Sequence, residues 1–401
     1  MIRTYKFRLR PTVRQEQALR EMLRDHCRMY NAALQERRDA YRHSSKTSIT
    51  YGQQSAQLKE IRAVDPDQAR WSFSSQQATL RRLNKAFAAF FRRVKAGDKP
   101  GYPRFKGVGH FDTVEFPRDG DGCRWDSSPH DRQTRVRLQG VGHVRVHQHR
   151  PVRGRVKTIS VGREGVHWYV ILACDEVPAE PLPATGAIVG IDMGTVHFFT
   201  DSNGAHKENP RFLNKSAEAL AEAQRCLSTF PERTQHRTKK HCAAARKAAK
   251  LHAKIRRQRL DHHHKTANEL VRDHDLIAHE KLNTAGMTKT PAPKPDPDNV
   301  GAFLRNGAAA KSGLNRSILD AGWGTFLRIL TDKAESAGRR VIVVDARNAS
   351  RTCPECGHAA KENRITQAKF ECVSCGFLAN ADHVGARNVL NRAGPALRNA
   401  A

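Results

Sequence analysis

Residues 353–388, CPECGHAAKENRITQAKFECVSCGFLANADHVGARN, hold the most informative pattern of this sequence. Its four cysteines form two Cys-x-x-Cys pairs with fifteen residues between the pairs: Cys353, Cys356, Cys372 and Cys375. This spacing is typical of a zinc ribbon, in which each pair supplies two thiolates to one tetrahedral zinc ion. Asp382 follows seven positions after the last cysteine. A structural zinc site directly before a lone carboxylate predicts a module inserted into an enzyme, beside a catalytic acid.

Length and composition describe a globular protein with more than one domain. The chain has 401 residues, enough for two or three domains that each bury a core, and 38% of them are hydrophobic. It has no run of about 18 apolar residues, and its first residues lack the apolar segment of a secretory signal. The other cysteines lie scattered, without the spacing of a disulfide framework: Cys27, Cys123, Cys174, Cys226 and Cys242. We therefore expect a cytoplasmic protein with reduced thiols and no membrane contact.

The charge balance indicates a polyanionic partner. Seventy Lys and Arg residues against forty Asp and Glu residues leave a net charge of +30. A field of this sign favours nucleic acid. A ribosome-like or merely basic protein stays open on charge alone, whereas membrane-surface binding is disfavoured because basic residues occur in all segments. The sequence has no GxxxxGK[ST] phosphate loop, which disfavours an NTP-driven motor.

The first part of the chain predicts a small β-barrel interrupted by helices. Residues 3–9 alternate between apolar and polar and predict a strand. A capping box at 12–15 opens a long helix, and a second helix opens at Ser74 and stops at Gly97. Short strands and turns follow from about 99 to 180.

Two segments of this strand-rich region have specific signals. A hairpin is expected at 157–174, with its turn at 162–165. The loop 99–106, KPGYPRFK, interleaves aromatic and basic residues, a mixture that suits backbone phosphates and stacked bases. Arg104 and Lys106 are its candidate contacts. An ordinary surface loop rich in proline and glycine has the same composition, so the loop alone does not decide between the two.

The second part of the chain predicts an α/β domain after a linker rich in proline at 178–183. Buried strands are expected at 187–192, 275–280 and 341–344, with a further strand at 196–200. An amphipathic helix is expected at 317–338, and the proline-rich stretch 291–297 predicts a flexible linker.

Residues 233–265 predict a strongly basic helix. They hold twelve Lys and Arg residues against one acid, Asp261. A solvated helix face is the usual meaning of such a run, but the near absence of acids favours a track for phosphates. The candidate contacts on it are Arg246, Lys250, Lys254 and Arg257. The run of histidines at 262–264 does not predict a metal site, because adjacent side chains on a helix point in different directions.

Three acids stand where catalysis can use them. Asp192 and Glu280 end predicted buried strands, and Asp382 precedes a predicted helix. Phosphodiester hydrolysis by two metal ions needs a few carboxylates brought together, and Mg²⁺ suits such a site because it keeps water and phosphate oxygens in its shell. Any one of these acids could instead cap an element or pair with an arginine. Three acids at the ends of successive elements of a basic domain favour catalysis.

At this point the sequence resembles the TnpB family, the transposon-encoded, RNA-guided DNA endonucleases regarded as ancestors of type V CRISPR effectors. The segments that carry the resemblance to the split RuvC nuclease of TnpB are 190–194 (GIDMG), 280–283 (EKLN), the cysteine pairs and the Asp382 region. Further similar segments are 5–12 (YKFRLRPT), 30–31 (YN), 86–87 (AF) with 90–91 (FF), 101–106 (GYPRFK) and 320–324 (DAGWG). The resemblance covers nearly the whole chain.

The resemblance implies a multidomain α+β fold. It implies a wedge-like β-barrel from 1–10 and 97–180, with a helical recognition domain at 11–96. It also implies a RuvC nuclease domain of the RNase H type from 185–348 and 377–401, with the zinc ribbon at 349–376 inserted in it. In this arrangement zinc is structural, and Asp192, Glu280 and Asp382 hold catalytic Mg²⁺, two ions in all.

The resemblance also implies the partners. A guide RNA derived from the transposon end pairs with double-stranded target DNA, while the protein reads only a short motif beside the target. By position, the motif-reading side chains fall at Tyr51, Phe73, Gln77 and Thr113. The basic helix lines the channel for the guide–target duplex, and one protein per guide RNA is expected.

The sequence departs from the family pattern near the last acid and before the first cysteine pair. Val384 stands where TnpB sequences often have Asn, followed by Gly385 where Ala is usual, and residues 349–351 are Ala-Ser-Arg rather than Thr-Ser-Gln. Neither departure removes a candidate metal ligand.

Three alternatives stay open at this stage. A miniature type V CRISPR effector has the same chemistry and differs in its genomic neighbourhood. A non-catalytic RNA-guided repressor binds targets without cutting, and the three intact acids argue against it. A DDE-type transposase fits less well, because the order of motifs along the chain is that of TnpB.

Overall fold

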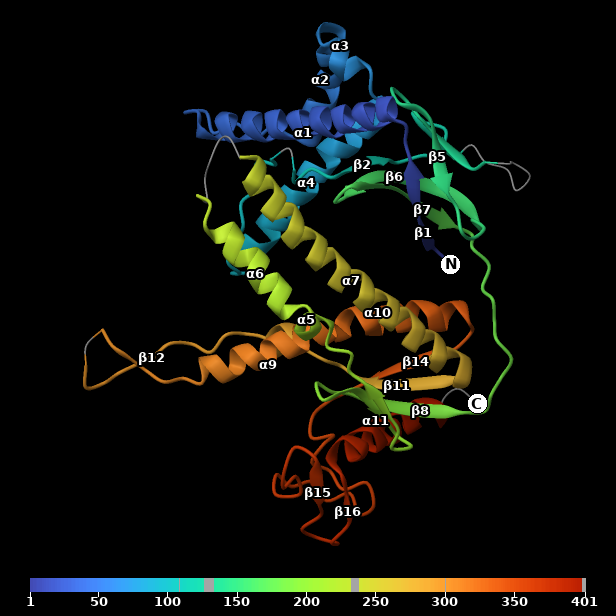
Figure 1. Ribbon diagram of the computed structural model, residues 1–401, viewed down its shortest axis with the longest axis vertical. Helices are drawn as coiled ribbons and strands as arrows, with labels where there is room; N and C mark the ends of the chain where they lie inside the picture. Colours follow the sequence, from blue (N-terminus) through green and yellow to red (C-terminus); the bar gives the residue numbers. More distant parts are fainter. Residues whose placement is uncertain (108, 126–132, 232–237, 300, 399–401) are drawn as a thin grey trace. The chain divides into compact units, whose positions relative to one another are not determined.

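The computed structural model describes residues 1–107, 109–125, 133–231, 238–299 and 301–398. The chain divides into two compact units, Met1–Pro178 and Ala179–Ala401. Their boundary lies in the proline-rich segment that the sequence predicts as a linker. Each unit has its own main sheet and hydrophobic core, so the protein is a multidomain α+β chain (Figure 1). The finer division into four domains stays a prediction.

The first unit is built on a seven-stranded antiparallel sheet. Its strands are β1 (Arg3–Arg10), β2 (Thr113–Phe116), β3 (Cys123–Trp125), β4 (Arg135–Leu138), β5 (Gly142–His147), β6 (Arg155–Glu164) and β7 (His167–Asp175). Their order across the sheet is β2-β6-β7-β1-β5-β4-β3. The predicted strand at 3–9 is confirmed as β1, the central strand, and its alternation buries Tyr5, Phe7 and Leu9.

Two predictions about this sheet need correction. Among the described strands, β2 and β3 are edges, and no pairing between them closes the predicted barrel, because both are short. The hairpin turn is also shorter than predicted. β6 pairs with β7 as far as Glu164, and the chain reverses at Gly165, the one glycine of the predicted turn with a positive φ, +62°.

Four helices precede most of these strands. They are α1 (Val13–Arg42), α2 (Tyr51–Val64), α3 (Pro66–Ala69) and α4 (Phe73–Lys95). The predicted capping box is confirmed, since the side chains of Thr12 and Gln15 each accept from the other's backbone N–H. α4 begins before the position that the sequence predicts. Ser72, not Ser74, caps it by accepting from the N–H of Ser75 at 3.3 Å, while Gly97, at φ +71°, ends the region as predicted.

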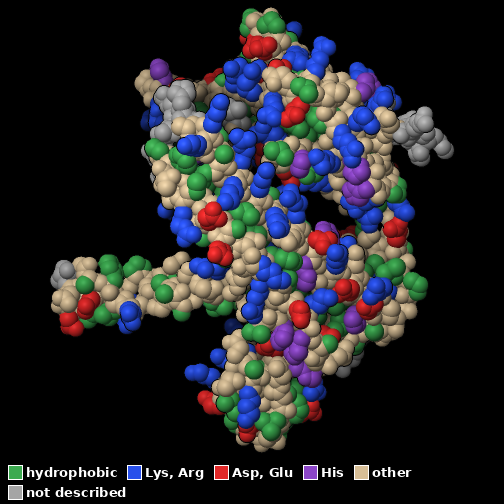
Figure 2. Space-filling model, in the orientation of Figure 1, with side chains coloured by type: hydrophobic (Ala, Val, Ile, Leu, Met, Phe, Trp, Pro, Cys, Tyr) green, Lys and Arg blue, Asp and Glu red, His purple; other side chains and the backbone are tan. Residues whose placement is uncertain are grey.

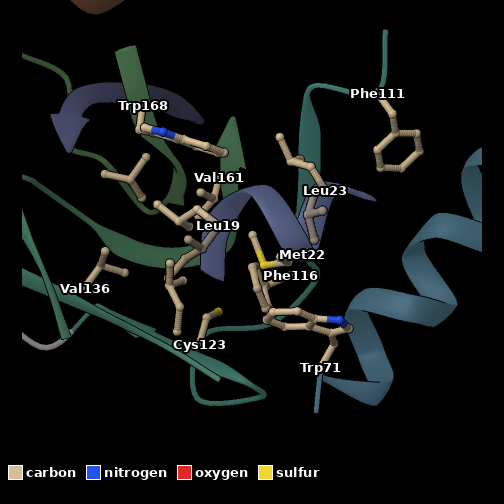
Figure 3. Close-up of a cluster of buried hydrophobic side chains, with 14 of the residues drawn as sticks. Leu19, Met22, Leu23, Trp71, Phe111, Phe116, Cys123, Val136, Val161 and Trp168 are labelled. Atoms are coloured by element: carbon tan, nitrogen blue, oxygen red, sulfur yellow. The ribbon is translucent and has the colours of Figure 1, made fainter. Parts of the chain in front are cut away.

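Helices and sheet of the first unit share one core. Leu19 and Met22 of α1 lie among Trp71, Phe116 and Trp168, which come from segments far apart in the sequence (Figure 3). Because such a core buries large aromatic side chains from both layers, the sheet and the helices stabilise one another.

The second unit has a five-stranded mixed sheet of order β10-β9-β8-β11-β14. The strands are β8 (Ile188–Met193), β9 (His197–Asp201), β10 (His206–Glu208), β11 (Leu276–Glu280) and β14 (Arg340–Val344). The helices are α5 (Phe212–Lys215), α6 (Ala217–Ser228), α7 (Lys239–Asp273), α8 (Thr284–Met287), α9 (Ala308–Ala321), α10 (Trp323–Ser336) and α11 (Ala381–Arg398). β8, β11 and β14 run parallel.

Helices cover both faces of this sheet. Val189, Ile191 and Ile277 pack with residues of α7 and α10 on one face. On the other face, Ala278 packs with Val389 of α11. Val189 and Ile191 face α7 and α10, and neighbouring residues of a strand face opposite sides of a sheet. Gly190, between them, therefore lies on the α11 face, as Ala278 does.

Three predictions about the second unit need correction. The helix expected at 317–338 is two helices, because Gly322 adopts φ +67° and ends α9 before α10 begins. The linker expected at 291–297 contains β12 (Lys294–Pro295), which pairs with β13 (Phe303–Leu304). β14 is an edge strand rather than a buried one, and Val343 in it is 54% exposed.

The basic helix and the acid-bearing strands form where the sequence predicts them. α7 starts at Lys239, and positions 233–237 of the prediction lie outside the described residues. None of the helices in the described part of the chain has the length and apolar character needed to cross a membrane.

The close contact of α11 with β8 generates a prediction about stability. A Cβ at Gly190 would lie 2.4 Å from the backbone oxygen of Ala386 and 2.8 Å from the backbone nitrogen of Leu390. Gly190→Ala is therefore expected to cost about 2 kcal/mol by overpacking, which lowers Tm by about 4–8 °C. Gly324→Ala in α10 is the control, because nothing lies within 4 Å of its added Cβ. Equal Tm values for the two variants in thermal unfolding would contradict the contact.

Candidate catalytic and nucleic-acid-binding sites

Strand register brings two of the predicted acids side by side. Ile191 of β8 pairs with His279 of β11 in a parallel ladder. Asp192 and Glu280 follow by one residue each, at the carboxyl ends of neighbouring strands, where side chains of parallel strands converge.

The third acid comes from the helix that covers this end of the sheet. Asp382 lies in the first turn of α11. A Cβ at Gly385, in the next turn, would lie 2.6 Å from Oδ2 of Asp192. The negative charge of Asp382 acts directly on Asp192. The structure therefore brings the three predicted acids together.

Burial and mutual repulsion disfavour ionisation of two of these acids. Burial, together with the charges of Glu280 and Asp382, raises the pKa of Asp192 to about 8, although Arg364 opposes the shift. Burial raises the pKa of Glu280 to about 7, where Arg392 lowers it and Asp345 raises it. Carboxylates crowded in this way are stabilised by a bound cation.

The donor set fits Mg²⁺, which binds through a few carboxylates and retains water. Among the described residues, the four ribbon cysteines alone bring three or more metal-type ligand atoms within 4.8 Å of one another. The three carboxylates are thus neighbours whose oxygens do not all meet at one point.

Two residues near the acids were missed by the sequence analysis. The Nη2 atom of Arg364 lies 3.6 Å from Oδ1 of Asp382, and Arg364 belongs to the segment between the two cysteine pairs. No sequence signal singles it out among seventy basic residues. Asp345 directly follows β14, which pairs in parallel with β11 so that Val344 lies opposite Glu280. The rule that found Asp192, an acid at the end of a parallel strand, could have found Asp345.

The four cysteines form a site with the geometry of tetrahedral zinc. The Sγ atoms of Cys353 and Cys375 lie 3.7 Å apart, and those of Cys356 and Cys372 lie 3.6 Å apart. Four thiolates at about 2.3 Å from a zinc ion lie about 3.8 Å from one another. The residues therefore fit a Cys₄ zinc site.

The two cysteine pairs have the same backbone arrangement. Gly357 and Gly376, each directly after the second cysteine of its pair, adopt φ values of +76° and +72°. Their N–H groups donate to the carbonyls of Cys353 and Cys372, at 3.0 and 2.9 Å. Glycine is needed here because other residues rarely adopt this conformation.

The ribbon packs directly on the start of α11. Phe370 of β15 (Lys369–Glu371) and Cys372 share a small core with Ala381 and Val384 of the helix. Val384, where the family often has Asn, is fully buried in this core. Farther along α11, the Asn388 side-chain amide donates to the carbonyls of Ala349 and Thr352, both at 2.7 Å.

Both departures from the family pattern near Asp382 therefore have a place in the structure. Val384 contributes apolar packing to the ribbon core. Gly385 leaves room for the carboxylate of Asp192. The Ala-Ser-Arg segment at 349–351 is held by its backbone, because the side-chain amides of Asn388 and Asn363 donate to the carbonyls of Ala349 and Arg351.

The predicted phosphate contacts on α7 lie on one face of the helix. Arg246, Lys250, Lys254 and Arg257 are all exposed, at spacings of four, four and three residues. The buried residues Ala244, Ala248 and Ile255 lie on other faces. Over this stretch the helix rises about 16 Å, which corresponds to about five phosphates along a strand. None of the four forms an ion pair with any residue that the structure describes.

The predicted basic loop is held by α1. Asn31 pairs with the backbone of Lys106 in both directions, accepting from its N–H and donating to its carbonyl, each at 2.8 Å. Lys106 is half-buried, whereas Arg104 is exposed. The loop therefore presents Arg104 from a defined backbone position.

Two of the four predicted motif-reading residues, Tyr51 and Gln77, form hydrogen bonds between α2 and α4. Arg81 donates to the hydroxyl of Tyr51 at 3.2 Å, and Gln77 donates to Ser55 at 3.0 Å. Phe73 starts α4, 41% exposed, with the guanidinium of Arg62 5.7 Å from its ring centroid.

Thr113 lines a basic cavity next to α4. Arg82 donates to its carbonyl at 3.3 Å. The cavity has a volume of about 320 Å³ and is lined by Ala78, Thr79, Arg81, Arg82, Lys85, Phe111, Thr113 and Glu115. Arg81 thus connects Tyr51 to the cavity that contains Thr113.

The sheet of the first unit carries a basic surface that the sequence analysis did not identify. Exposed arginines face each other directly across strands: Arg10 with Arg145, and Arg124 with Arg137. Like charges directly opposite on a sheet destabilise it, so these pairs favour a bound polyanion. Lys and Arg side chains are also scattered widely over the molecular face in Figure 2, where they outnumber Asp and Glu. Cross-strand register, which the sequence does not show, creates the pairs.

The raised pKa values of the acids generate a pH prediction. In the metal-free site Asp192 and Glu280 keep protons that an unfolded chain releases near pH 4. Their contribution to stability is present below that pH and is lost as pH rises to about 8. Without Mg²⁺, we expect Tm to fall by about 4–8 °C more in the native protein than in Asp192→Asn between about pH 5 and pH 8.5. If calorimetry gives the same dependence of Tm on pH for the two proteins, the raised pKa of Asp192 is contradicted.

The cysteine geometry generates a prediction about zinc. Cys353→Ser removes a buried ligand and is expected to reduce zinc content from about one ion per chain to a small fraction, with loss of stability in the second unit. Activity should fall through this local misfolding, whereas Asp382→Ala should lower activity with zinc content and Tm preserved. Metal analysis by mass spectrometry measures the difference. Cys226→Ser is the control, because Cys226 is exposed and outside the cluster, and a full zinc content in Cys353→Ser would exclude the site.

Three family models match the chain. The OrfB model of IS605 elements, described as "Probable transposase", matches residues 169–290, and the "Cas12f1-like, TNB domain" model matches residues 323–389. The "Helix-turn-helix domain" model of OrfB matches residues 1–46, which in this structure hold β1 and α1.

Relatives match over nearly the full length. InsQ of Escherichia coli (strain K12), named as an RNA-guided DNA endonuclease, is 33% identical over 97% of this chain and 92% of InsQ. A Streptomyces pristinaespiralis protein with the same description is 29% identical over 97% of this chain and 88% of its own length. Among solved structures, the mini-RNA-guided endonuclease CRISPR-Cas_phi3 aligns over 98% of this chain and 92% of its own, with 11% identity and a TM-score of 0.48. The full-length match to InsQ, together with the OrfB models, shows that the chain belongs to the TnpB family.

Proposed function

We propose that this protein is an RNA-guided DNA endonuclease that cuts target DNA by metal-dependent hydrolysis in one RuvC-type site. The observation that carries the proposal is the meeting of Asp192, Glu280 and Asp382 at one end of the second sheet, two of them with raised pKa values. The names of the two full-length relatives support the guided activity.

In this proposal the three carboxylates hold two Mg²⁺ ions. Bound Mg²⁺ lowers the pKa of water and neutralises charge on the scissile phosphate. Residues of α11 would position the carboxylates. Gly385 has no side chain that would clash with the carboxylate of Asp192, and the first turn of the helix holds Asp382 near it. Arg364, 3.6 Å from Asp382, presents a cation that steadies charge on the phosphate oxygens as the bond to the leaving oxygen breaks.

The second unit would then be a RuvC domain of the RNase H type with an inserted zinc ribbon. Its parallel strands β8, β11 and β14 and the flanking helices support this assignment. Structural zinc would hold the ribbon against α11. The sheet and helices of the first unit would serve as wedge and recognition domains.

The partners in this proposal are a guide RNA from the transposon end and double-stranded DNA, with one protein per guide. The exposed cation row of α7 would contact the guide–target duplex, and the arginine-rich sheet face would contact further phosphates. Tyr51, Phe73, Gln77 and Thr113 would read the short motif beside the target. Action on DNA would place the protein at the nucleoid of a prokaryotic cell.

Reconstitution with its guide RNA tests the proposal. RNA that copurifies with the protein is sequenced, and the complex is given DNA that carries the matching target in Mg²⁺. We expect guide-dependent cutting, and we expect Asp192→Ala to reduce its rate by at least about 10³-fold with target affinity within about threefold of the native complex, because the carboxylate holds metal and contacts no base.

Two matched comparisons make the outcome specific. Asp261→Ala removes an exposed acid that pairs with Lys265 on α7 and should leave cutting intact. Unchanged cutting by Asp192→Ala would overturn the catalytic assignment. Guided binding without any Mg²⁺-dependent product from the native protein would instead identify an RNA-guided repressor, and a guide encoded by a repeat–spacer array would identify a CRISPR effector.

A further inference from the structure

A group of aromatic rings near the end of α4 has no role in the site described above. Phe87, Phe90 and Phe91 of the helix meet Tyr102 of the basic loop. Tyr102 contacts Phe87 and Phe90 edge-to-face, with centroids 5.6 and 5.4 Å apart, and Phe90 contacts Phe91 in the same way at 5.1 Å. These contacts fix the rings relative to one another.

The outer rings of this group remain exposed. Phe91 is 61% exposed and Tyr102 is 45% exposed, and Phe105, three residues farther along the loop, is 44% exposed. The core of the first unit includes only Phe87, as a partly buried neighbour. Folding of the chain therefore leaves ring surface that a binding partner can cover.

The rings are surrounded by positive charge. α4 holds six basic residues and no acid between Phe73 and Lys95, and Asp98 is the one acid between the helix and the loop. The loop adds three more basic residues, and the guanidinium of Arg38 lies 5.9 Å from the Phe105 ring centroid. In the described part of the chain, the basic residues nearest the rings form no ion pair: Arg92, Arg93, Lys95, Lys99, Arg104 and Lys106. An uncharged or basic protein partner does not fit such a rim.

Backbone contacts hold the loop against the helix. Arg93 donates to the carbonyl of Gly101 at 3.2 Å, next to Tyr102, and Asn31 holds Lys106 at the other end of the loop. The rings are thus presented on a fixed support, which lowers the entropy cost of binding a flexible strand.

We infer that Phe91 and Tyr102, held by their shared contacts with Phe87 and Phe90, form a stacking platform for unpaired DNA bases. Proteins hold single strands without reading their sequence by combining exposed aromatic rings with basic side chains that contact the backbone, and both are present here. The choice of DNA rests on the proposed function. Gln77 lies on the same helix, fourteen residues or about 21 Å from Phe91. If Gln77 contacts the motif, the platform lies within about six nucleotides of the point where the DNA strands separate.

A fluorescent oligonucleotide tests the platform without a guide or cleavage. The probe is a single-stranded oligo(dT) with one 2-aminopurine, whose emission falls when it stacks on a ring. The full-length native protein should bind and quench it. Phe91→Ala with Tyr102→Ala should weaken binding about tenfold, with quenching lost and the dependence of affinity on salt unchanged, because stacking releases no counterions. Arg92→Gln should lower that salt slope by about one and keep the quenching.

Further variants separate stacking from folding and from general hydrophobic contact. Phe91→Leu retains an apolar side chain of similar size and should lose most of the quenching. Val166→Ala, at an exposed apolar residue in the β6–β7 turn, should behave as the native protein. Thermal unfolding identifies any variant that fails to fold. If the double alanine variant does not fold, the quenching by Phe91→Leu distinguishes stacking from general hydrophobic contact.

Three results would overturn the inference: binding without quenching by the native protein, full quenching by Phe91→Leu, or tighter binding of the matching RNA oligonucleotide. Loss of guided cutting with quenching intact would count against the proposed function and leave the platform in place.

Discussion

The position of the acids depends on one close backbone contact. α11 approaches β8 at Gly190, where an added Cβ would come within 2.4 Å of a helix carbonyl oxygen. The same approach sets Gly385 against the carboxylate of Asp192 and places the first turn of the helix, with Asp382, at the ends of β8 and β11. The acids repel one another and cannot assemble this site by themselves. The packing of helix on strand supplies the free energy that holds them together until cations bind.

The zinc ribbon is part of the same arrangement. Its core includes two residues of α11, Ala381 and Val384, on either side of Asp382. It also carries Arg364 to within ion-pair distance of that acid. The four-cysteine cluster therefore supports the end of the helix at which the acid cluster forms. In our proposal zinc performs no chemistry and maintains the shape of this helix start.

The acidic site residues gather at one place, whereas exposed positive charge is distributed over several surfaces. The acids gather at one end of the second sheet, whereas exposed cations form a row on α7, directly opposed pairs on the first sheet and a rim around the aromatic rings of α4. Each of these surfaces carries like charges close together, which costs stability in the free protein. A polyanion removes that cost, and divalent ions do the same for the acids. The basic surfaces are therefore suited to bind nucleic acid, and the acid cluster is suited to bind divalent metal ions.

Most of the helices and strands, and the types of metal ligand, can be predicted from local sequence. Alternation predicted β1, the spacing of the cysteines predicted a zinc cluster, and Asp192 and Glu280 were identified because each ends an apolar strand. Local patterns suffice for these features, since they depend on neighbours along the chain. Tertiary structure alone decided the break at Gly322, the exposed edge of β14, the opposed arginines and the position of Arg364. Each of these depends on which distant segment lies alongside, and pairing across strands or packing between helices leaves no periodic signal in the sequence.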